Sequence, residues 1–398
     1  MCFSNNKEKH MDNQEEWRRR RAIERHSRGE KPRAICVSLG RTERWLYKWL
    51  ERFQSGESEW YRECSRKPVQ VPSRTPAEIE GIVKLFRLEL YNRGEFCGAQ
   101  AIRWQLEEQN VQPLPSLRTI SRILSRHALT HRRTGRYEPK GKRYPALDAP
   151  HPGSVHETDF VGPCYLRGPL RFYSLNTADL ATGRCGTEPV LRGKDTVTEA
   201  LWATWLRLGL PKCLQVDNDA VFYGSPTHPR GMGKLIRLCL PLGIEPCFIP
   251  LAEPWRNGVV EKFNDHWRQK FLDRVDMESE EDLRRESLAF EQRHNCRYRY
   301  SKLKGRTPAE ALAASPKPLR FPVHEHPPKQ PLPKPKAGYY HVVRFIRSDA
   351  IFNLFGEKFS MPPEAVYEYT WATVDVARQR LAFYLDDDIL DEREYLLR

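Results

Sequence analysis

Three acidic residues of this 398-residue sequence stand where a carboxylate is costly to keep. Asp159 lies within the strand-length run 155–161, which is expected to be half-buried, and Asp217 ends a second, more apolar run. Glu261 follows an Asn-Gly turn and begins an expected helix over 259–272. A carboxylate in apolar surroundings must be paired, hydrogen-bonded or bound to a metal ion. Taken singly, each is also compatible with an ordinary surface acid, such as one at a strand end. Their assignment to one site therefore depends on the motifs around them.

That context consists of three short motifs, Glu157-Thr158-Asp159-Phe160, Val216-Asp217-Asn218 and Asn257-Gly258-Val259-Val260-Glu261. In this order they resemble the Asp-Asp-Glu triad of retroviral-integrase-like transposases from bacterial insertion sequences. The run Tyr-Ser-Lys-Leu-Lys-Gly-Arg-Thr-Pro-Ala-Glu at 300–310 is similar to the family's tail signature after the catalytic core. The likeness covers nearly the whole chain and implies a multidomain protein. Its expected parts are α-helical helix-turn-helix modules, an α/β RNase H-like catalytic core with a mixed sheet, and a C-terminal small β-barrel.

The resemblance implies that Asp159, Asp217 and Glu261 are catalytic residues and metal ligands. Two Mg²⁺ or Mn²⁺ ions ~4 Å apart can activate an attacking oxygen and stabilise a leaving oxygen in phosphodiester chemistry. Hard carboxylate oxygens suit these ions. By the resemblance Asp159 would bind both ions, with Asp217 on one and Glu261 on the other. Asn264 and Arg268 lie one and two helical turns beyond Glu261 and would hold DNA near the scissile phosphate, although Arg268 is equally compatible with a solvated helix face.

Two features depart from the family pattern. Asp219 stands where the family usually has Gly after Asp-Asn, which either assists metal binding or perturbs the loop. In addition, 43 residues separate Asp217 from Glu261, where the family often has about thirty-five. A count of about thirty-five would select Glu253, but Pro254 follows it in an expected loop, so Glu261 is preferred. The extra residues are expected in the Gly-, Pro- and His-rich stretch 224–233.

The N-terminal region has the pattern of a helix-turn-helix module. Apolar residues recur at helical spacing on both sides of Gly40, which suits a turn with positive φ. Thr42 can cap the second helix. A helix whose outer face is polar and basic is typical of major-groove recognition, although small helical hairpins are also common. The residues expected to contact DNA here are Arg41, Thr42, Arg44, Tyr47 and Lys48.

A second module of the same kind is expected over 75–130. Pro113 and Pro115 end one apolar stripe, and Ser116 can cap a further helix. In that helix the apolar residues face inward, which leaves Arg118, Thr119 and Arg122 for DNA. Arg132 and Arg133 begin a basic stretch without periodicity that could follow a phosphate backbone.

The rest of the chain divides by composition. Three strand-length runs followed by alternating helices and strands predict the mixed sheet of the core. A stretch rich in Pro and Lys reads as an extended spacer, and short alternating runs after it predict a small all-β module. The expected parts are a helix-turn-helix module (14–65), a second, winged-helix-like module (75–130), a basic linker (131–150), the catalytic core (151–314), a Pro/Lys-rich linker (315–337) and a small β-barrel (338–398).

Charge and composition agree with this division. The chain has 66 Lys and Arg against 52 Asp and Glu, for a formal net charge of +14. Residues 1–150 hold 31 of the basic and 19 of the acidic residues, so the N-terminal third contains most of the excess. This distribution indicates a polyanion-binding region beside a nearly neutral remainder, with a solubilising tail as the alternative. No apolar run approaches the ~20 residues of a membrane span, and the ten scattered cysteines favour neither a zinc module nor a disulfide framework.

We therefore expect a transposase that binds the terminal inverted repeats of a mobile element and performs metal-dependent nicking and strand transfer. Its expected partners are double-stranded DNA, both element ends and target, and further copies of itself on that DNA, with no membrane. The expected location is the cytoplasm of a prokaryote, with the nucleoid. Two alternatives stay open: a catalytically inactive DNA-binding regulator or assembly factor of the same fold, and an RNase H-like nuclease without transfer activity.

Overall fold

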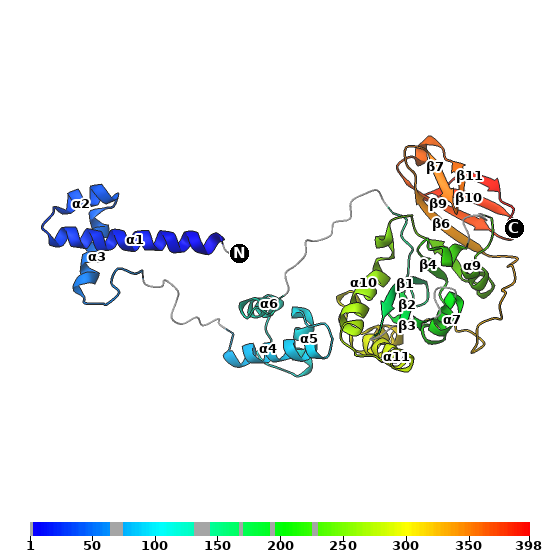
Figure 1. Cartoon of the computed structure of the whole chain (residues 1–398), viewed down its shortest axis with the longest axis horizontal. Coiled ribbons are helices and arrows are strands. Elements are labelled where there is room, and N and C mark those ends of the chain that lie inside the picture. Colours follow the sequence, from blue (N-terminus) through cyan, green and yellow to red (C-terminus); the bar gives the residue numbers. More distant parts are fainter. Residues whose placement is uncertain (1–2, 64–74, 131–143, 167–169, 192–195, 225–229) are drawn as a thin grey trace. The chain divides into compact units, whose positions relative to one another are not determined.

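The computed structural model describes residues 3–63, 75–130, 144–166, 170–191, 196–224 and 230–398. The chain divides into two compact units, residues 1–74 and residues 75–398. Each unit has its own apolar core and is described by itself (Figure 1).

The first unit contains three helices, α1 (Phe3–Ser27), α2 (Pro32–Leu39) and α3 (Glu43–Gln54). Gly40 ends α2 with φ of 63°, and the Thr42 hydroxyl accepts a hydrogen bond from the Trp45 amide at 3.3 Å at the start of α3. Ile35, Leu46 and Trp49 are buried in the core that these helices share. The turn glycine and the cap predicted from the sequence are therefore confirmed, and they set the break between the second and third helices.

The second unit begins with three more helices, α4 (Ala77–Asn92), α5 (Ala99–Glu108) and α6 (Leu117–Arg126). The Ser116 hydroxyl accepts a hydrogen bond from the Thr119 amide at 3.2 Å, as expected for the cap of α6. Ile120, Ile123 and Leu124 are buried. Residues 75–130 contain no strand; a wing that followed α6 would begin within 131–143, outside the described residues.

A nine-stranded mixed sheet forms the centre of the second unit, with the order β11-β10-β9-β6-β5-β4-β1-β2-β3. β1, β4, β5 and β6 are parallel to one another, and antiparallel strands continue the sheet on both sides. A separate hairpin is formed by β7 and β8. The strands are β1 (Val155–Tyr165), β2 (Arg171–Asp179), β3 (Cys185–Val190), β4 (Cys213–Val216), β5 (Glu245–Phe248), β6 (Tyr339–Phe345), β7 (Ile351–Leu354), β8 (Glu357–Ser360), β9 (Tyr369–Asp375), β10 (Arg380–Leu385) and β11 (Asp388–Glu394).

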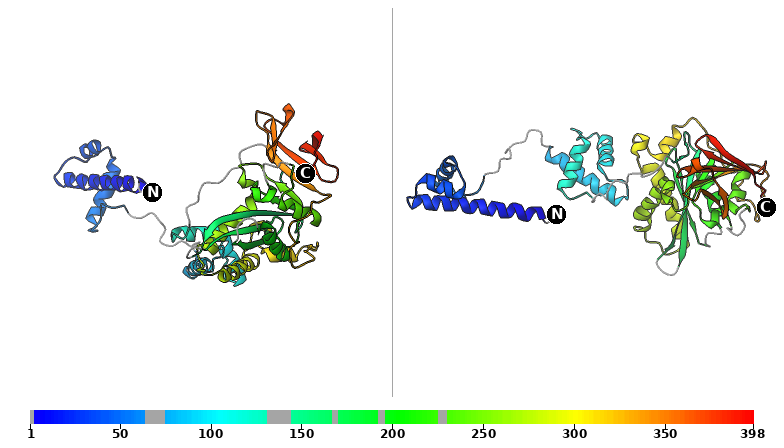
Figure 2. Two further views of the ribbon diagram at one scale, coloured as in Figure 1. Left: turned by 45° about the vertical axis from the view of Figure 1, so that its right-hand side comes forward. Right: turned by 90° about the horizontal axis from the view of Figure 1, so that it is seen from above.

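Helices cover both faces of this sheet, as Figures 1 and 2 show. One face packs against α7 and α9, and the other against α10 and α11. Side chains of β2 point alternately to the two faces of the sheet, so Leu175 joins the first core, whereas Phe172 and Ala178 join the second. The helices of this part are α7 (Val197–Leu208), α8 (Ala220–Tyr223), α9 (Lys234–Cys239), α10 (Gly258–Trp267), α11 (Glu280–Arg297) and α12 (Pro308–Ala313); the short η helices are η2 (Leu240–Leu242), η3 (Pro254–Asn257), η4 (Arg268–Leu272), η5 (Ser301–Leu303) and η6 (Pro363–Ala365).

The C-terminal strands differ from the separate small β-barrel expected over 338–398, and that barrel is not confirmed. β6 pairs in parallel with β5, with Cys247 opposite His341 and Phe248 opposite Val342, so that β6, β9, β10 and β11 extend the core sheet. Their side chains share one apolar core with α7 and α9. The sequence did not reveal this pairing because it joins residues about ninety positions apart across a proline-rich stretch.

Two expected linkers also pack against the core. Within 131–150, the described residues Tyr144 and Leu147 lie against a cluster that includes Val343 and Tyr369. In the Pro/Lys-rich stretch 315–337, Leu332 is buried. The carbonyls of that stretch accept hydrogen bonds from core side chains, as the Leu332 carbonyl does from Arg237 at 3.2 Å. An extended chain leaves its carbonyls available to neighbouring donors, which explains why this spacer is held against the core.

Candidate active site and DNA-facing helices

Strand register brings Asp159, within β1, level with Asp217, directly after the neighbouring strand β4. β1 and β4 are parallel, and their last paired residues are Thr158 and Val216. Asp159 and Asp217 follow these residues directly, so Asp217 lies just past the end of β4 while Asp159 lies level with it within β1, which continues to Tyr165. Parallel strands present such residues side by side. Asp159 is half-buried, and Asp217 follows a fully buried strand.

Glu261 comes to these residues on α10, and a buried carboxylate fixes the beginning of that helix. Glu157 Oε2 accepts hydrogen bonds from the amides of Val259 at 2.8 Å and Val260 at 2.9 Å. Gln215, on β4, donates to Glu157 Oε1 at 3.3 Å and to Asn257 Oδ1 at 3.0 Å. These amides are among the groups that a helix leaves without an internal partner. Glu157 therefore joins β1 to the first turn of α10, which also contains Glu261.

A chain of amides and hydroxyls holds Asp159 from the opposite side. Asn264 Nδ2 donates to Asp159 Oδ2 at 2.8 Å, and Asn264 Oδ1 accepts from Asn176 Nδ2 at 2.8 Å. Ser174 in turn donates to Asn176 Oδ1 at 2.8 Å. These bonds orient Asn264 through β1 and β2, while its partly exposed side chain also lines the cavity beside Asp159. The contact with DNA expected of Asn264 stays a prediction, and the structure adds its hydrogen bond to Asp159.

The carboxylates in this region resist ionisation. Burial, followed by the charge of Asp217, raises the pKa of Asp159 to about 6. Burial also raises the pKa of Glu157 to about 7, against the opposing effect of its two backbone hydrogen bonds. Burial and the charge of Asp265 raise the pKa of Glu261. Neighbouring carboxylates repel one another when ionised, and a bound cation would relieve this repulsion.

The residues have the chemistry of a Mg²⁺ or Mn²⁺ site, because their donors are carboxylate oxygens near one another. Among the described residues, no three His, Cys, Asp or Glu side chains lie close enough together to hold a metal ion in this conformation. Asp159 and Asp217 are the pair whose charges interact most directly, and Glu261 adds a weaker effect on Asp159. We therefore take Asp159 and Asp217 as the nucleus of the candidate site, with Glu261 beside it.

Asp219 has a local structural role in this loop. Its amide donates to Asp217 Oδ1 at 3.1 Å, and its own Oδ1 accepts from the Val221 amide at 3.1 Å as the cap of α8. Asp at a helix start commonly does this. The loop thus uses the aspartate in place of glycine to begin a short helix. The stretch 224–233, where the sequence placed the extra residues, lies partly outside the described residues.

The alternative acid, Glu253, is used elsewhere. Its carboxylate accepts hydrogen bonds from the Tyr369 hydroxyl at 2.8 Å and from Arg256 Nε at 2.9 Å. Arg256 also stacks over the Tyr144 ring, 4.1 Å from its centroid. These contacts fix the loop that precedes α10. These contacts give Glu253 a structural role, whereas Glu261 lines the cavity beside Asp159.

A cavity of about 830 Å³ lies beside Asp159 and Glu261. Trp255 lies in the cavity wall, with 48% of its surface exposed. An α-helix was expected through residue 272, but α10 ends at Trp267 and continues as the π-helix η4. Arg268 is exposed at the start of η4. The lining residues are Asp159, Phe160, Val161, Gly162, Trp255, Gly258, Glu261, Lys262, Asn264, Asp265, Arg268 and Gln269.

Several of these residues were not found from the sequence. Glu157 and Trp255 stand inside or next to the quoted motifs, so their position was a usable signal. Asn176 lies in the middle of a strand and has no such signal. Its role depends on Asn264, which is 88 positions away. Lys262 and Gln269 directly follow Glu261 and Arg268 in the sequence, so their adjacency to the named residues was the available signal.

The expected DNA-contacting residues of α3 are mostly on its surface. Arg44, Tyr47, Lys48 and the cap Thr42 are exposed. Arg41 instead forms an ion pair with Glu15 of α1. Thus α3 presents a polar, basic face next to the turn, as expected.

The corresponding residues of α6 have a similar arrangement. Arg118 and Arg122 are exposed, whereas Thr119 is half-buried and lies with its hydroxyl 3.0 Å from that of Ser116. Arg132 and Arg133 lie outside the described residues. α6 therefore carries two exposed arginines one turn apart.

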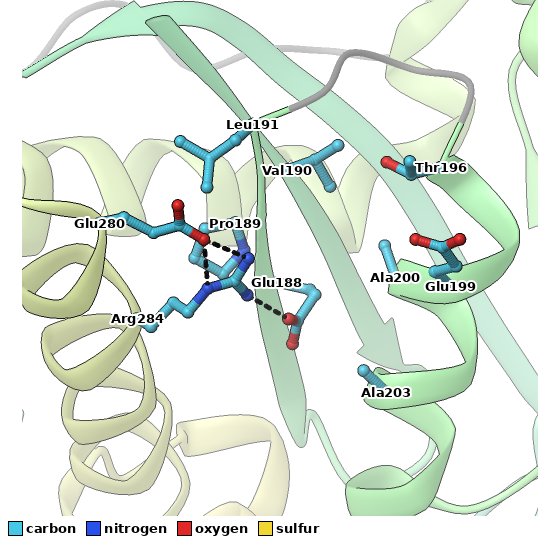
Figure 3. Close-up of a pocket in the computed structure, with 10 residues that line it drawn as sticks. All are labelled: Glu188, Pro189, Val190, Leu191, Thr196, Glu199, Ala200, Ala203, Glu280 and Arg284. Carbon is cyan, nitrogen blue, oxygen red and sulfur yellow. Dashed lines mark hydrogen bonds and ion pairs between the residues drawn. The ribbon is translucent and has the colours of Figure 1, made fainter. Parts of the chain in front are cut away.

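Another pocket, of about 330 Å³, lies between β3, α7 and α11 (Figure 3). Two of its acids, Glu188 and Glu280, are engaged by arginines. Arg284 contacts Glu280 at 2.9 Å and Glu188 at 3.4 Å, and Arg207 contacts Glu188 at 3.1 Å. This pocket lies apart from Asp159 in the fold, and its ion pairs stabilise the packing of α11 on β3.

Comparison with known proteins gives one family match and several structural similarities. Residues 13–60 match the model of a homeodomain-like domain, which confirms the helix-turn-helix prediction for the first unit. The HTLV-2 integrase catalytic core domain in complex with magnesium, in its dimeric form, is 15% identical; the match covers 42% of this chain and 99% of that one, with a TM-score of 0.32.

Two further integrase structures are similar at the same level. The simian T-cell lymphotropic virus intasome in complex with PP2A regulatory subunit B56 gamma is 15% identical, with coverage of 79% and 97% and a TM-score of 0.37. The BIV integrase catalytic core domain is 15% identical, with coverage of 40% and 94% and a TM-score of 0.32. Scores this low carry no argument about activity. Within the described part of the chain, no helix is both long and apolar enough to cross a membrane.

Proposed function

We propose that this protein is a DNA transposase of the retroviral-integrase-like type, which binds the terminal inverted repeats of a mobile element and performs nicking and strand transfer. The observation that carries the proposal is the register of β1 and β4, which places Asp159 beside Asp217, with Glu261 on α10 lining the same cavity as Asp159. Bound Mg²⁺ or Mn²⁺ would activate the attacking oxygen and stabilise the leaving oxygen. Asp159, Asp217 and Glu261 would hold the ions.

The protein's own residues orient this site. Asn264 donates a hydrogen bond to Oδ2 of Asp159 and so helps to fix the orientation of this carboxylate. Glu157 sets the start of α10 and hence the height of Glu261 relative to β1. Lys262 and Arg268, both exposed at the cavity, supply positive charge for phosphates. The indole of Trp255 offers a flat apolar surface on which a base can stack.

The helical parts supply the recognition of DNA ends. A homeodomain-like helix-turn-helix unit inserts its last helix into the major groove, and the exposed residues of α3 fit that position. The two exposed arginines of α6 would contact a second stretch of the same end. Transfer of two ends into one target requires two active sites, so we propose that several copies assemble on DNA.

Nicking and strand-transfer assays with the DNA that flanks the coding region test this proposal. In Mg²⁺, Asp159→Asn and Glu261→Gln should each reduce the nicking rate at least about 100-fold, which corresponds to ~2.7 kcal/mol of activation free energy. Glu253→Gln is the matched control, because it changes an acid eight positions earlier whose contacts are structural; it should keep most of the activity. Activity that survives in Asp159→Asn would reject the proposed site. Binding of the repeats without cleavage by the unaltered protein would favour the inactive regulator, and cleavage without joining would favour the nuclease.

A further inference from the structure

Arg344 is a buried arginine that reaches from the C-terminal part of the sheet into the loops of the candidate site. It lies on β6, and only 5% of its surface is exposed. Nη2 donates to Asn218 Oδ1 at 2.8 Å, and Nη1 donates to the Ile249 carbonyl at 3.0 Å. Nε donates to the Asn353 carbonyl at 3.0 Å. One guanidinium thus joins three segments that are far apart in the sequence.

Two of these segments carry the acids of the site. Asn218 stands directly after Asp217, and Ile249 begins the loop that leads from β5 to α10 and Glu261. Asn218 Nδ2 also donates to the Ile249 carbonyl, so Arg344 and Asn218 hold the same oxygen. The loop after β4 and the loop after β5 are therefore fixed to one another through a side chain from β6.

The chemistry of the contacts requires an arginine. Every acceptor recorded for its side chain among the described residues is an amide or backbone carbonyl oxygen, and none is a carboxylate. A buried charge is expensive without such compensation. Burial lowers the pKa of Arg344 to about 10, so the guanidinium stays charged at neutral pH. Its planar fork can reach acceptors in several directions at once, which a lysine ammonium on a single stem cannot reproduce.

We infer that Arg344 is a positioning residue of the active site, which acts through Asn218 and the Ile249 carbonyl to set the distance between the Asp217 loop and the loop before Glu261. The inference rests on the proposed function. It assigns a part of the catalytic unit to the C-terminal strands, which the sequence had placed in a separate β-barrel. The core 151–314 is then incomplete without β6.

Hydrogen exchange of the full-length protein, without metal or DNA, tests the inference independently of activity. The Asp219 amide donates to Asp217 Oδ1, and the Val221 amide donates to Asp219, so both report the order of this loop. In Arg344→Lys these amides should exchange at least about 10-fold faster. Arg237→Lys is the matched control, because Arg237 also donates to backbone carbonyls, those of Met232 at 2.9 Å and Leu332, but does not contact the Asp217 loop. It should leave both amides unchanged.

A second variant separates positioning from general stability. Asn218→Ala keeps Arg344 with its carbonyl acceptors and removes the side chain through which it acts. It should accelerate exchange at Asp219 and Val221 by a similar factor, and adding Arg344→Lys should then have little further effect. In nicking assays, Arg344→Lys should lower the rate at least about 10-fold with the affinity for repeat DNA unchanged.

Unchanged exchange in Asn218→Ala, or equal acceleration in Arg237→Lys, would overturn the inference even if Arg344→Lys fails to fold. Full nicking activity in a folded Arg344→Lys protein would also overturn it. If the unaltered protein is inactive while the exchange results hold, the proposed function fails and the positioning contact stands.

Discussion

Substitution of Glu157 tests whether the structure places α10 correctly. Glu157 is 3% exposed, and its Oε2 accepts from the amides of Val259 and Val260. In Glu157→Ala both amides lose their partner in a buried position. Each such loss costs about 1–3 kcal/mol, so local opening of the first turn of α10 should become easier by about 2 kcal/mol or more. Hydrogen exchange at residues 259–261 should accelerate at least about 30-fold.

The pH dependence gives a second, independent measurement on the same residue. Burial raises the pKa of Glu157 in the folded state to about 7, from 4.5 in an ordinary environment. For an acid shifted in this direction, folding is favoured by the neutral form, and this stability is lost as the pH rises through about 7. Glu157→Gln is neutral at every pH and keeps an oxygen acceptor. Relative to Glu157→Gln, the unaltered protein should therefore lose roughly 2 kcal/mol of local stability between pH 5 and pH 8, at ~1.4 kcal/mol per unit of pKa shift.

Both comparisons are made on metal-free, full-length protein, so that Asp159 is the same in every sample. Glu280→Ala is the control for substitution of an acid in a helix, because Glu280 lies at the start of α11 and contacts Arg284 at the surface. It should leave α10 unaffected. If exchange in α10 is the same in Glu157→Ala as in the unaltered protein, or if the difference from Glu157→Gln is flat across this pH range, the described cap is wrong.

Three further predictions concern other parts of the molecule. Asn264→Ala removes the donor to Asp159 and should lower the nicking rate about 10-fold without weakening repeat binding, as gel-shift titration beside kinetics would show; equal loss of binding would contradict it. Lys48→Ala should reduce the slope of log K against log salt for repeat DNA by about 0.9, whereas Arg28→Ala, in the turn directly after α1, should not change it. His294 is fully buried and its pKa is lowered to about 3 by burial, so stability should fall as the pH decreases below about 6.5, and thermal unfolding of His294→Gln should show a shallower loss.

The parts of the structure that the sequence predicted well are local. Gly40 and Thr42 determine a turn and a cap from their own conformational preferences, and Ser116 does the same for α6. The run that ends at Asp217 is apolar apart from Gln215, as expected for a central parallel strand that is buried on both faces. The alternating elements predicted a mixed sheet, and the structure adds the pairing of this strand with the strand of Asp159. For these residues, neighbours within a few positions contain enough information.

The residues that orient the acids depend on contacts across the chain. Glu157 meets the amide of Val259 across 102 positions, and Arg344 meets Asn218 across 126. In the sequence, Glu157 is one polar residue in a strand, and Arg344 interrupts an apolar run as any outward-facing arginine would. Only the tertiary pairing of β6 with β5 turns Arg344 inward. A strand residue's face is set by its register, and register is decided by partners that local patterning does not specify.

The basic residues of this protein have different roles in the N-terminal third and in the core. The basic excess of the N-terminal third indicates the DNA partner, and the exposed residues of α3 and α6 agree with that role. In the core, Lys262 and Arg268 are exposed at the cavity, whereas Arg344 is buried and donates only to amide and backbone carbonyl oxygens among the described residues. An arginine paired directly with Asp159 or Asp217 would neutralise the acids and compete with a divalent ion. Because Arg344 acts one residue away, through Asn218 and a carbonyl, it can order the loop and still leave the negative charge of the acids for metal ions.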